Sequence, residues 1–269
     1  MSSHSDFIFT LFTNRAELAA AADTAGIDRI GVDLESIGKQ ARQGHLNTWI
    51  SDHQEHDLPA LRPAIRHGKL FARCNPVHPG LQDELDRLLA AGVEVIMLPY
   101  FQSASEAERF IRLLDGRATP VLLLETAAAA TDIQNICQLD GINEIHIGLN
   151  DLHLSLGWPS HFHLLVSDLL QHLSDRILNA GMRLGIGGLG RAGDNNLPIP
   201  ADLVCAQLPR LGATASLISR AFFRGNQIVD LKTEIPKLRQ QLGDFKRQPG
   251  SIKQQYRSQL QARLEKRPK

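Results

Sequence analysis

Short apolar runs alternate along the chain with longer segments in which apolar residues recur at helical spacing. The runs are rich in leucine, β-branched and aromatic residues, which is typical of buried strands. Helical spacing is clear in "NRAELAAAADTAG" and "SASEAERFIRLLDG", each of which separates two such runs. The pattern predicts eight strands: "FIFTLF" (7–12), "RIGVDL" (29–34), "KLFARC" (69–74), "EVIMLP" (94–99), "PVLLLE" (120–125), "EIHIGL" (144–149), "RLGIGG" (183–188) and "TASLIS" (214–219).

Eight strands separated by helices predict an α/β fold, a single (β/α)8 TIM barrel, with an open doubly wound sheet as the alternative. Glycines fall where several of the helices would end, as C-cap glycines do. They are Gly26, Gly92, Gly116, Gly141 and Gly181. We expect the barrel to occupy residues 1–240 and a basic C-terminal helix or tail to occupy residues 241–269.

Two segments depart from this regular alternation. Residues 36–68 have room for a helix and a long polar loop rich in histidine, and long loops after strands are usually functional or mobile. The end of the chain, from Asp244 to Lys269, carries eight Lys and Arg residues against Asp244 and Glu265. We interpret it as a solvated helix or frayed tail, with a nucleic-acid or lipid contact as the alternative.

The composition excludes several classes of protein. The 269 residues can bury a large core, and Lys+Arg equals Asp+Glu at 29 each, so no global charge favours nucleic acid or a membrane. The three cysteines are far apart and form no C-x-x-C pair, which is typical of a reducing compartment and predicts a cytoplasmic protein. The apolar patch at the N-terminus lacks a basic region, so we expect a first strand and no signal peptide, and no run is long enough to span a membrane.

The predicted strand ends carry an unusual number of charged and amide side chains. In a barrel the carboxyl ends of all strands face one pocket. The side chains at these ends are Asp33, Glu35, Arg73, Asn75, Glu125, Asp151 and Arg220. Because a buried carboxylate needs a partner, either a salt bridge to Arg73 or a divalent cation would hold Glu125 and Asp151. Two carboxylates with open positions suit Mg²⁺ or Mn²⁺, and a structural ion-pair cluster explains the same residues.

These segments resemble a known family. "RIGVDLESIGKQAR" and "ARCNP" are similar to the second and third strand ends of the citrate lyase β-subunit group. "LLLETAAA" and "HIGLNDLHLSLG" resemble the paired metal-binding segments of the HpcH/HpaI aldolase and citrate lyase superfamily. The similarity covers roughly residues 7 to 225.

The resemblance implies a metal-dependent carbon–carbon lyase that acts on a small-molecule 2-oxo acid, and a homo-oligomer. By this similarity Glu125 and Asp151 would bind Mg²⁺ or Mn²⁺. Arg73 would lie on the keto or enolate oxygen and serve the reaction rather than the fold. The backbone amides around Asn150 and Asp151 would hold the substrate carboxylate.

The chain also departs from the family pattern. Ser36 stands where the aldolase branch carries a histidine used in proton transfer, Leu123 where it carries a glutamine, and Tyr100 where the citrate lyase branch carries a lysine. We therefore predict that the proton-transfer group is His45 on the long loop, with His53 as an alternative. A metal-bound water held by Asp33 or Glu35 is the next candidate for that role.

The missing histidine keeps other functions open. A non-catalytic barrel that binds an oxo acid is one, and a decarboxylase or citrate-type condensing enzyme with the same metal site is another. Lys39 and Arg42 could pair with a second substrate carboxylate or only with Asp33 and Glu35.

Three further features have simpler explanations than function. His146 lies inside a predicted strand and is expected to be a hydrogen-bonded core residue. His153 could contact the metal ligands without binding the metal itself. The glycine-rich "GIGGLGR" (185–191) lacks the βαβ context and acidic residue of a dinucleotide site, although its amides could reach a phosphate or carboxylate. No G-x-S-x-G motif is present, so serine hydrolase chemistry has no support.

Overall fold

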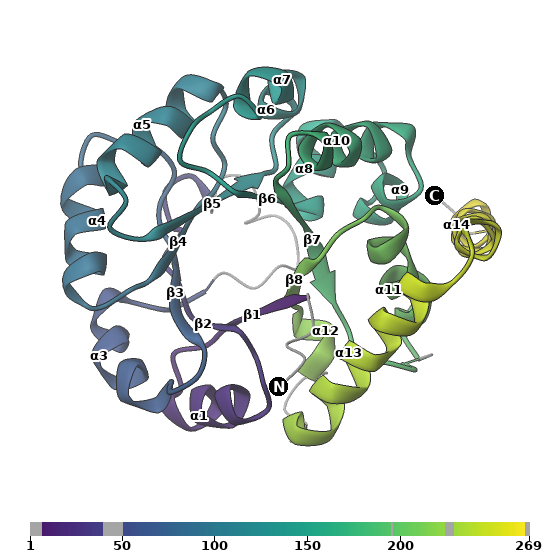
Figure 1. Cartoon of the computed structure of the whole chain (residues 1–269), viewed down its shortest axis with the longest axis horizontal. Helices are drawn as coiled ribbons and strands as arrows, with labels where there is room; N and C mark the ends of the chain where they lie inside the picture. The colour runs from purple at the N-terminus through teal and green to yellow at the C-terminus, as the bar shows by residue number, and fades with distance from the viewer. Residues whose placement is uncertain (1–6, 40–50, 195, 224–228, 267–269) are drawn as a thin grey trace.

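The computed structural model describes residues 7–39, 51–194, 196–223 and 229–266. Eight parallel strands form a closed barrel in chain order, inside a ring of helices (Figure 1). The barrel closes because β1 pairs with both β2 and β8, so the sheet has no edge, and the open-sheet alternative is wrong. The strands are β1 (Ile8–Phe12), β2 (Arg29–Asp33), β3 (Lys69–Arg73), β4 (Val95–Leu98), β5 (Thr119–Leu124), β6 (Glu144–Ile147), β7 (Arg183–Leu189) and β8 (Ala215–Ile218).

Helices cover the outside of the barrel, and the four with the clearest amphipathic pattern bury leucine, isoleucine or phenylalanine against it. The helices are α1 (Ala16–Thr24), α3 (Leu58–Leu61), α4 (Leu81–Ala90), α5 (Ala104–Leu114), α6 (Ala127–Thr131), α7 (Ile133–Ile136), α8 (Leu149–Ser155), α9 (His161–Leu165), α10 (Asp168–Asn179), α11 (Ala201–Arg210), α12 (Arg220–Phe223), α13 (Leu231–Arg247) and α14 (Gly250–Glu265). Two 3-10 turns, Glu55–Asp57 and Arg62–Ala64, flank α3.

The barrel interior is divided into an apolar and a polar side. Strands β3 to β5 contribute a separate buried cluster of apolar side chains: Phe71, Val95, Met97, Val121 and Leu123. Across the amino-terminal end, Arg29 of β2 makes a bidentate salt bridge to Glu144 of β6, with both N–O distances 2.7 Å. In the sequence, Phe71 and Leu123 of this cluster each stand two residues before a charged strand end, Arg73 and Glu125.

The glycines of β7 are explained by packing. A Cβ at Gly185 would lie 2.2 Å from Nδ1 of His146, and one at Gly188 would lie 2.8 Å from Cβ of Ser219. The register between β7 and β8 shifts between these two glycines. The run "GIGGLGR" therefore makes room for neighbouring side chains in the sheet.

The C-terminal extension is helical, as predicted. Helix α13 lies between α1 and α11 and completes the helix ring, and α14 packs beside α11 and α9 (Figure 1). Leu260 and Leu264 of α14 are buried, and Arg257 donates to the carbonyl of Val166 at 2.6 Å. The tail thus docks through one face, and its division from the barrel at residue 240, which falls within α13, stays a prediction. Among the described helices, none is long and apolar enough to cross a membrane.

Candidate active site

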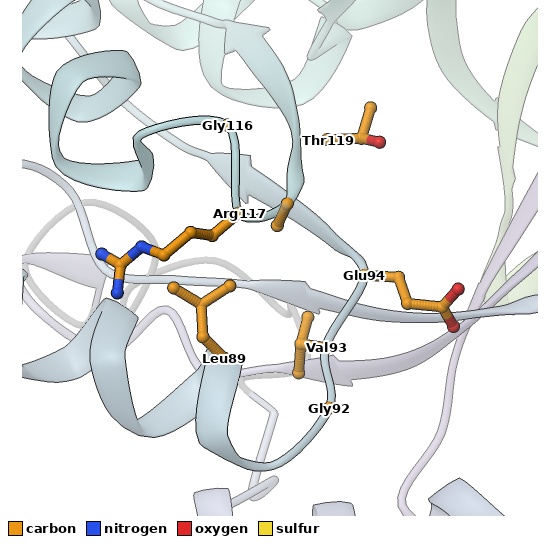
Figure 2. Close-up of a pocket in the computed structure, with 8 residues that line it drawn as sticks. Leu89, Gly92, Val93, Glu94, Gly116, Arg117 and Thr119 are labelled. Atoms are coloured by element: carbon orange, nitrogen blue, oxygen red, sulfur yellow. The ribbon is translucent and has the colours of Figure 1, made fainter.

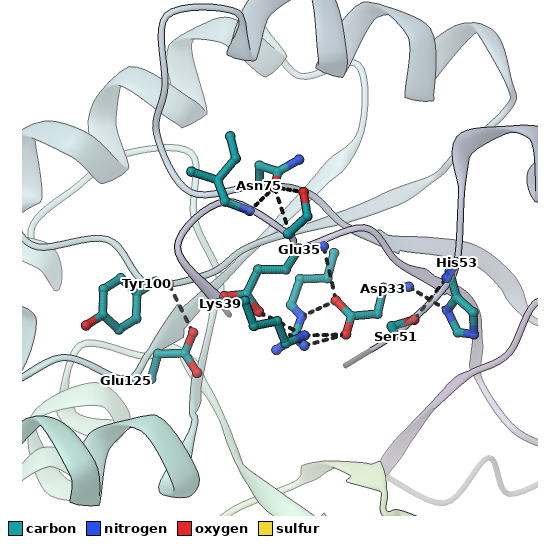
Figure 3. Close-up of polar contacts among 11 residues, drawn as sticks. Asp33, Glu35, Lys39, Ser51, His53, Asn75, Tyr100 and Glu125 are labelled. Atoms are coloured by element: carbon teal, nitrogen blue, oxygen red, sulfur yellow. Dashed lines mark hydrogen bonds and ion pairs between the residues drawn. The ribbon is translucent and has the colours of Figure 1, made fainter. Parts of the chain in front are cut away.

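The strand ends β2 and β3 are joined by a buried ion-pair cluster (Figure 3). The guanidinium of Arg73 donates from Nε to Asp33 Oδ1 at 2.8 Å and from Nη2 to Asp33 Oδ2 at 2.7 Å. Its Nη2 also lies 3.2 Å from Glu35 Oε2. Arg73 was expected to serve the reaction rather than the fold, but two buried carboxylates also depend on it for neutralisation.

Lys39 is the second cation of this cluster. Its side chain is buried, and Nζ lies 2.8 Å from Asp33 Oδ2 and 3.4 Å from Glu35 Oε2. Of the two roles considered for Lys39, the structure therefore supports pairing with Asp33 and Glu35. Arg42 lies outside the described residues.

The pairing fixes the protonation state of Asp33 and Arg73. Burial alone would raise the pKa of Asp33, but attraction and hydrogen bonds from Arg73 and Lys39 outweigh it and hold that pKa well below its usual range. Burial opposes the charge on Arg73, yet Asp33 and Glu35 raise its pKa, and Glu125 adds to the effect. Asp33 is consequently a poor proton acceptor and a strong anchor for the guanidinium.

Glu125, just beyond the end of β5, is 2% exposed and is oriented by an unusual backbone turn. The backbone N–H of Tyr100 donates to Glu125 Oε1 at 3.1 Å (Figure 3). Tyr100 adopts a φ of 50°, a left-handed conformation that costs a non-glycine residue free energy and tends to occur at functional sites. This contact could not be predicted from the sequence, since it uses the backbone of Tyr100 rather than its ring.

Asp151 lies in the first turn of α8 and is 6% exposed. Gly148 lies at the start of the same helix and packs against Glu125. It is the N-cap of α8, its N–H donates to the carbonyl of Leu124, and a Cβ on it would lie 2.6 Å from Glu125 Oε2. Glu125 therefore reaches across the start of the helix that carries Asp151, and only glycine leaves it that space. Asn150, half-buried, occupies the same helical turn.

This donor set fits a hard divalent cation. Within the described ranges, the strand ends and the start of α8 carry four buried carboxylates, Asp33, Glu35, Glu125 and Asp151, and Arg73 and Lys39 pair with the first two. No group of three or more His, Cys, Asp or Glu side chains with metal-binding geometry occurs in the described part of the chain. Two carboxylate oxygens would therefore leave the remaining positions to water and substrate oxygens, as Mg²⁺ allows.

The proton-transfer candidates differ in position. His45 lies outside the described residues and stays a prediction. His53 accepts a hydrogen bond at Nδ1 from the backbone N–H of Asp33 at 3.0 Å, and burial lowers its pKa. It is therefore neutral with its proton on Nε2, which makes Nε2 a donor rather than a base. Ser36 donates its hydroxyl hydrogen to Asn75 Oδ1 at 3.2 Å.

The other predicted residues lie on β6, α8 and α12. His146 is buried in β6, and its Nε2 donates to the carbonyl of Gly187 at 3.2 Å, which confirms it as a core residue. His153 is buried on α8 near the carbonyl of Leu149. Arg220 is exposed at the start of α12.

A hollow of about 540 Å³ lies at the opposite end of the barrel, before β4 and β5 (Figure 2). Its charged side chains already have partners, since Arg117 pairs with Asp86 at 2.7 Å and Glu94 pairs with Arg62 at 2.8 Å. In TIM barrels the chemistry occurs at the carboxyl ends of the strands, so this hollow is not the candidate site.

Comparison with known proteins matches most of the chain to one family. The family model described as HpcH/HpaI aldolase/citrate lyase matches residues 7–191. The 4-hydroxy-2-oxovalerate aldolase of Rhodococcus jostii (strain RHA1) is 33% identical over 79 residues, which are 29% of this chain. The match spans 31% of that relative's length.

Solved structures share the fold at low identity. An HpcH/HpaI aldolase/citrate lyase family protein from Burkholderia cenocepacia J2315 has a TM-score of 0.63 and 17% identity, over 90% of this chain and 95% of that chain. An HpcH/HpaI aldolase from Desulfitobacterium hafniense DCB-2 has a TM-score of 0.62 and 17% identity, over 91% and 94%. The citrate synthase SbnG has a TM-score of 0.60 and 17% identity, over 82% and 89%.

Proposed function

This chain belongs to the HpcH/HpaI aldolase/citrate lyase family, and we propose that it is a divalent-metal-dependent lyase that cleaves a carbon–carbon bond of a 2-oxo acid. The observation that carries the proposal is the pair of buried carboxylates Glu125 and Asp151, linked through Gly148, beside an anchored Arg73. The name of the Rhodococcus relative supports 4-hydroxy-2-oxo acids as the substrate class.

Glu125 and Asp151 would hold Mg²⁺ or Mn²⁺ and leave room for the oxygens of the substrate. When bound, the cation would polarise the keto group and carry part of the negative charge that develops on its oxygen. The first N–H groups of α8, including those of Asn150 and Asp151, would bind the substrate carboxylate, because helix starts have amides without partners in the helix.

Arg73 would stabilise the enolate oxygen. Among the described residues, its hydrogen bonds to carboxylates use Nε and Nη2, which leaves Nη1 for a ligand. Asp33 and Glu35 act in the reaction by fixing the direction of this guanidinium before the substrate arrives. A preorganised donor of this kind stabilises charge that exists only once bond breaking begins.

The electron and proton balance of the cleavage shows that a base and a proton donor are required. The C3–C4 bond of a 4-hydroxy-2-oxo acid breaks, its electron pair forms the enolate of pyruvate, and the C4 hydroxyl proton leaves to a base, which yields an aldehyde. The enolate then takes a proton at C3. We propose His45 as the base because Ser36 and His53 are both engaged as described and Asp33 is held ionised.

The test is pyruvate release from a panel of 4-hydroxy-2-oxo acids, with and without Mg²⁺ or Mn²⁺. Glu125→Gln should abolish release and also the thermal stabilisation by metal, which reaches ~2.7 kcal/mol at a hundredfold excess over Kd. The matched control is Glu108→Gln, an exposed glutamate on α5.

The alternatives give different results. Metal and oxo-acid binding without turnover would favour the non-catalytic barrel, and CO₂ release or a condensation product would favour a decarboxylase or a citrate-type enzyme. A wild type that neither binds metal nor releases pyruvate would contradict the proposal. The homo-oligomeric state and cytoplasmic location stay predictions.

A further inference from the structure

Asn75 and its neighbours form a hydrogen-bonded latch that has no part in the mechanism above. The Asn75 side-chain oxygen accepts from the backbone N–H of Ser36 at 2.9 Å, from the Ser36 hydroxyl at 3.2 Å and from the backbone N–H of Ile37 at 3.0 Å (Figure 3). The amide of Asn75 thus holds the two residues that directly follow Glu35.

Glu84 fixes the orientation of that amide. It is buried on α4, and its Oε1 accepts from the backbone N–H of Asn75 at 2.9 Å and from Asn75 Nδ2 at 3.2 Å. Its Oε2 lies 2.8 Å from Nε2 of His78. Because Nδ2 of Asn75 is used by Glu84, the side-chain oxygen must face Ser36 and Ile37.

The latch acts on the ion-pair cluster through a short turn. The N–H of Lys39 donates to the carbonyl of Ser36 at 3.3 Å, and Gly38 has a φ of 72°, so the turn brings Lys39 back over Glu35. Arg73 and Asn75 leave the same strand end two residues apart. Arg73 binds the side chains of Asp33 and Glu35, while Asn75 binds the backbone that follows them.

We propose that Asn75, supported by Glu84, is a positioning residue that holds Glu35 and Lys39 and thereby the direction of the Arg73 guanidinium. The inference rests on the proposed function, since its consequence is better stabilisation of an enolate oxygen than of a keto oxygen. The proposed metal ligands Glu125 and Asp151 lie just beyond β5 and on α8, on other elements than the latch.

Two variants break the latch and two preserve it. Asn75→Ala removes the acceptor, and Glu84→Leu removes its support without leaving a buried charge unpaired. Glu84→Gln keeps an acceptor for Asn75, and Asn135→Ala changes an exposed amide on α7. Amide hydrogen exchange at Ser36 and Ile37 should be faster in the first two variants and unchanged in the others.

Ligand binding separates positioning from a purely structural role. In the presence of Mg²⁺, the affinity for oxalate, whose oxygens resemble the enolate of pyruvate, should fall ~10-fold in Asn75→Ala and Glu84→Leu. Pyruvate affinity and thermal stabilisation by Mg²⁺ alone should remain those of the wild type, and Glu84→Gln should retain oxalate affinity.

Unchanged exchange at Ser36 and Ile37, or an equal loss of oxalate and pyruvate affinity, would overturn the positioning role. A wild type that binds Mg²⁺ but neither oxalate nor pyruvate would contradict the proposed function and with it the assigned consequence for Arg73. In that case faster exchange in Asn75→Ala would still establish the latch as an anchor of the turn.

Discussion

Replacing His146 by glutamine should make the fold less sensitive to acid. The imidazole is fully enclosed in β6, and burial lowers its pKa from 6.5 to about 4. The unfolded chain therefore binds a proton near pH 6.5, whereas the folded chain resists it until about pH 4. Stability contributed by the neutral ring is complete above pH 6.5 and is lost as the pH falls toward 4.

The size of this loss follows from the shift in pKa. A lowering from 6.5 to about 4 corresponds to roughly 3 kcal/mol of unfolding free energy. Asp33 acts in a different range, because a carboxylate with a lowered pKa loses its stabilising effect only as the pH falls below about 4. The change in unfolding free energy between pH 6.5 and 4 consequently reports on buried histidine rather than on the ion-pair cluster. His161, whose pKa burial also lowers to about 4, contributes in the same window and is left unchanged.

Urea unfolding at several pH values between 7 and 4.5 measures the effect. The unfolding free energy of His146→Gln should fall less steeply with pH than that of the wild type, even if packing over Gly185 makes the variant less stable at pH 7. The control is His172→Gln, an exposed residue on α10, which should follow the wild-type curve. Parallel curves for His146→Gln and the wild type would refute the assignment of this acid sensitivity to His146.

Two further predictions concern the candidate site. Gly148→Ala should abolish thermal stabilisation by Mg²⁺, because its Cβ would lie 2.6 Å from Glu125 Oε2. Calorimetry measures this stabilisation. The control is Gly250→Ala, which has open space around its Cβ position. Retained Mg²⁺ affinity would show that Glu125 is not a ligand. Arg73→Lys keeps the charge but loses the two-point contact with Asp33, so kcat should fall ~10²–10³-fold. Near-wild-type turnover would remove Arg73 from the mechanism.

The sequence by itself determined the barrel and the end of it at which the charged side chains gather. Apolar runs of strand length separated by helical segments permit few arrangements, and the structure places all eight strands within two residues of their predicted ends. Because the carboxyl ends of barrel strands border one common pocket, the placement of Asp33, Arg73, Glu125 and Asp151 at or shortly after strand ends followed from the pattern alone. The glycine of "HIGLND" was visible too, but its role needs the carboxylate of Glu125 beside it.

Tertiary structure decided which charges are paired. Arg73 could have served Glu125 or Asp151, yet it binds Asp33 and Glu35, because the register of β2 against β3 sets Asp33 directly beside Arg73. The latch from Asn75 to Ser36 and the left-handed turn at Tyr100 were likewise hidden. Periodicity in a sequence fixes the face on which a side chain lies, but its partner depends on strand register and backbone angles that arise only when distant segments pack together.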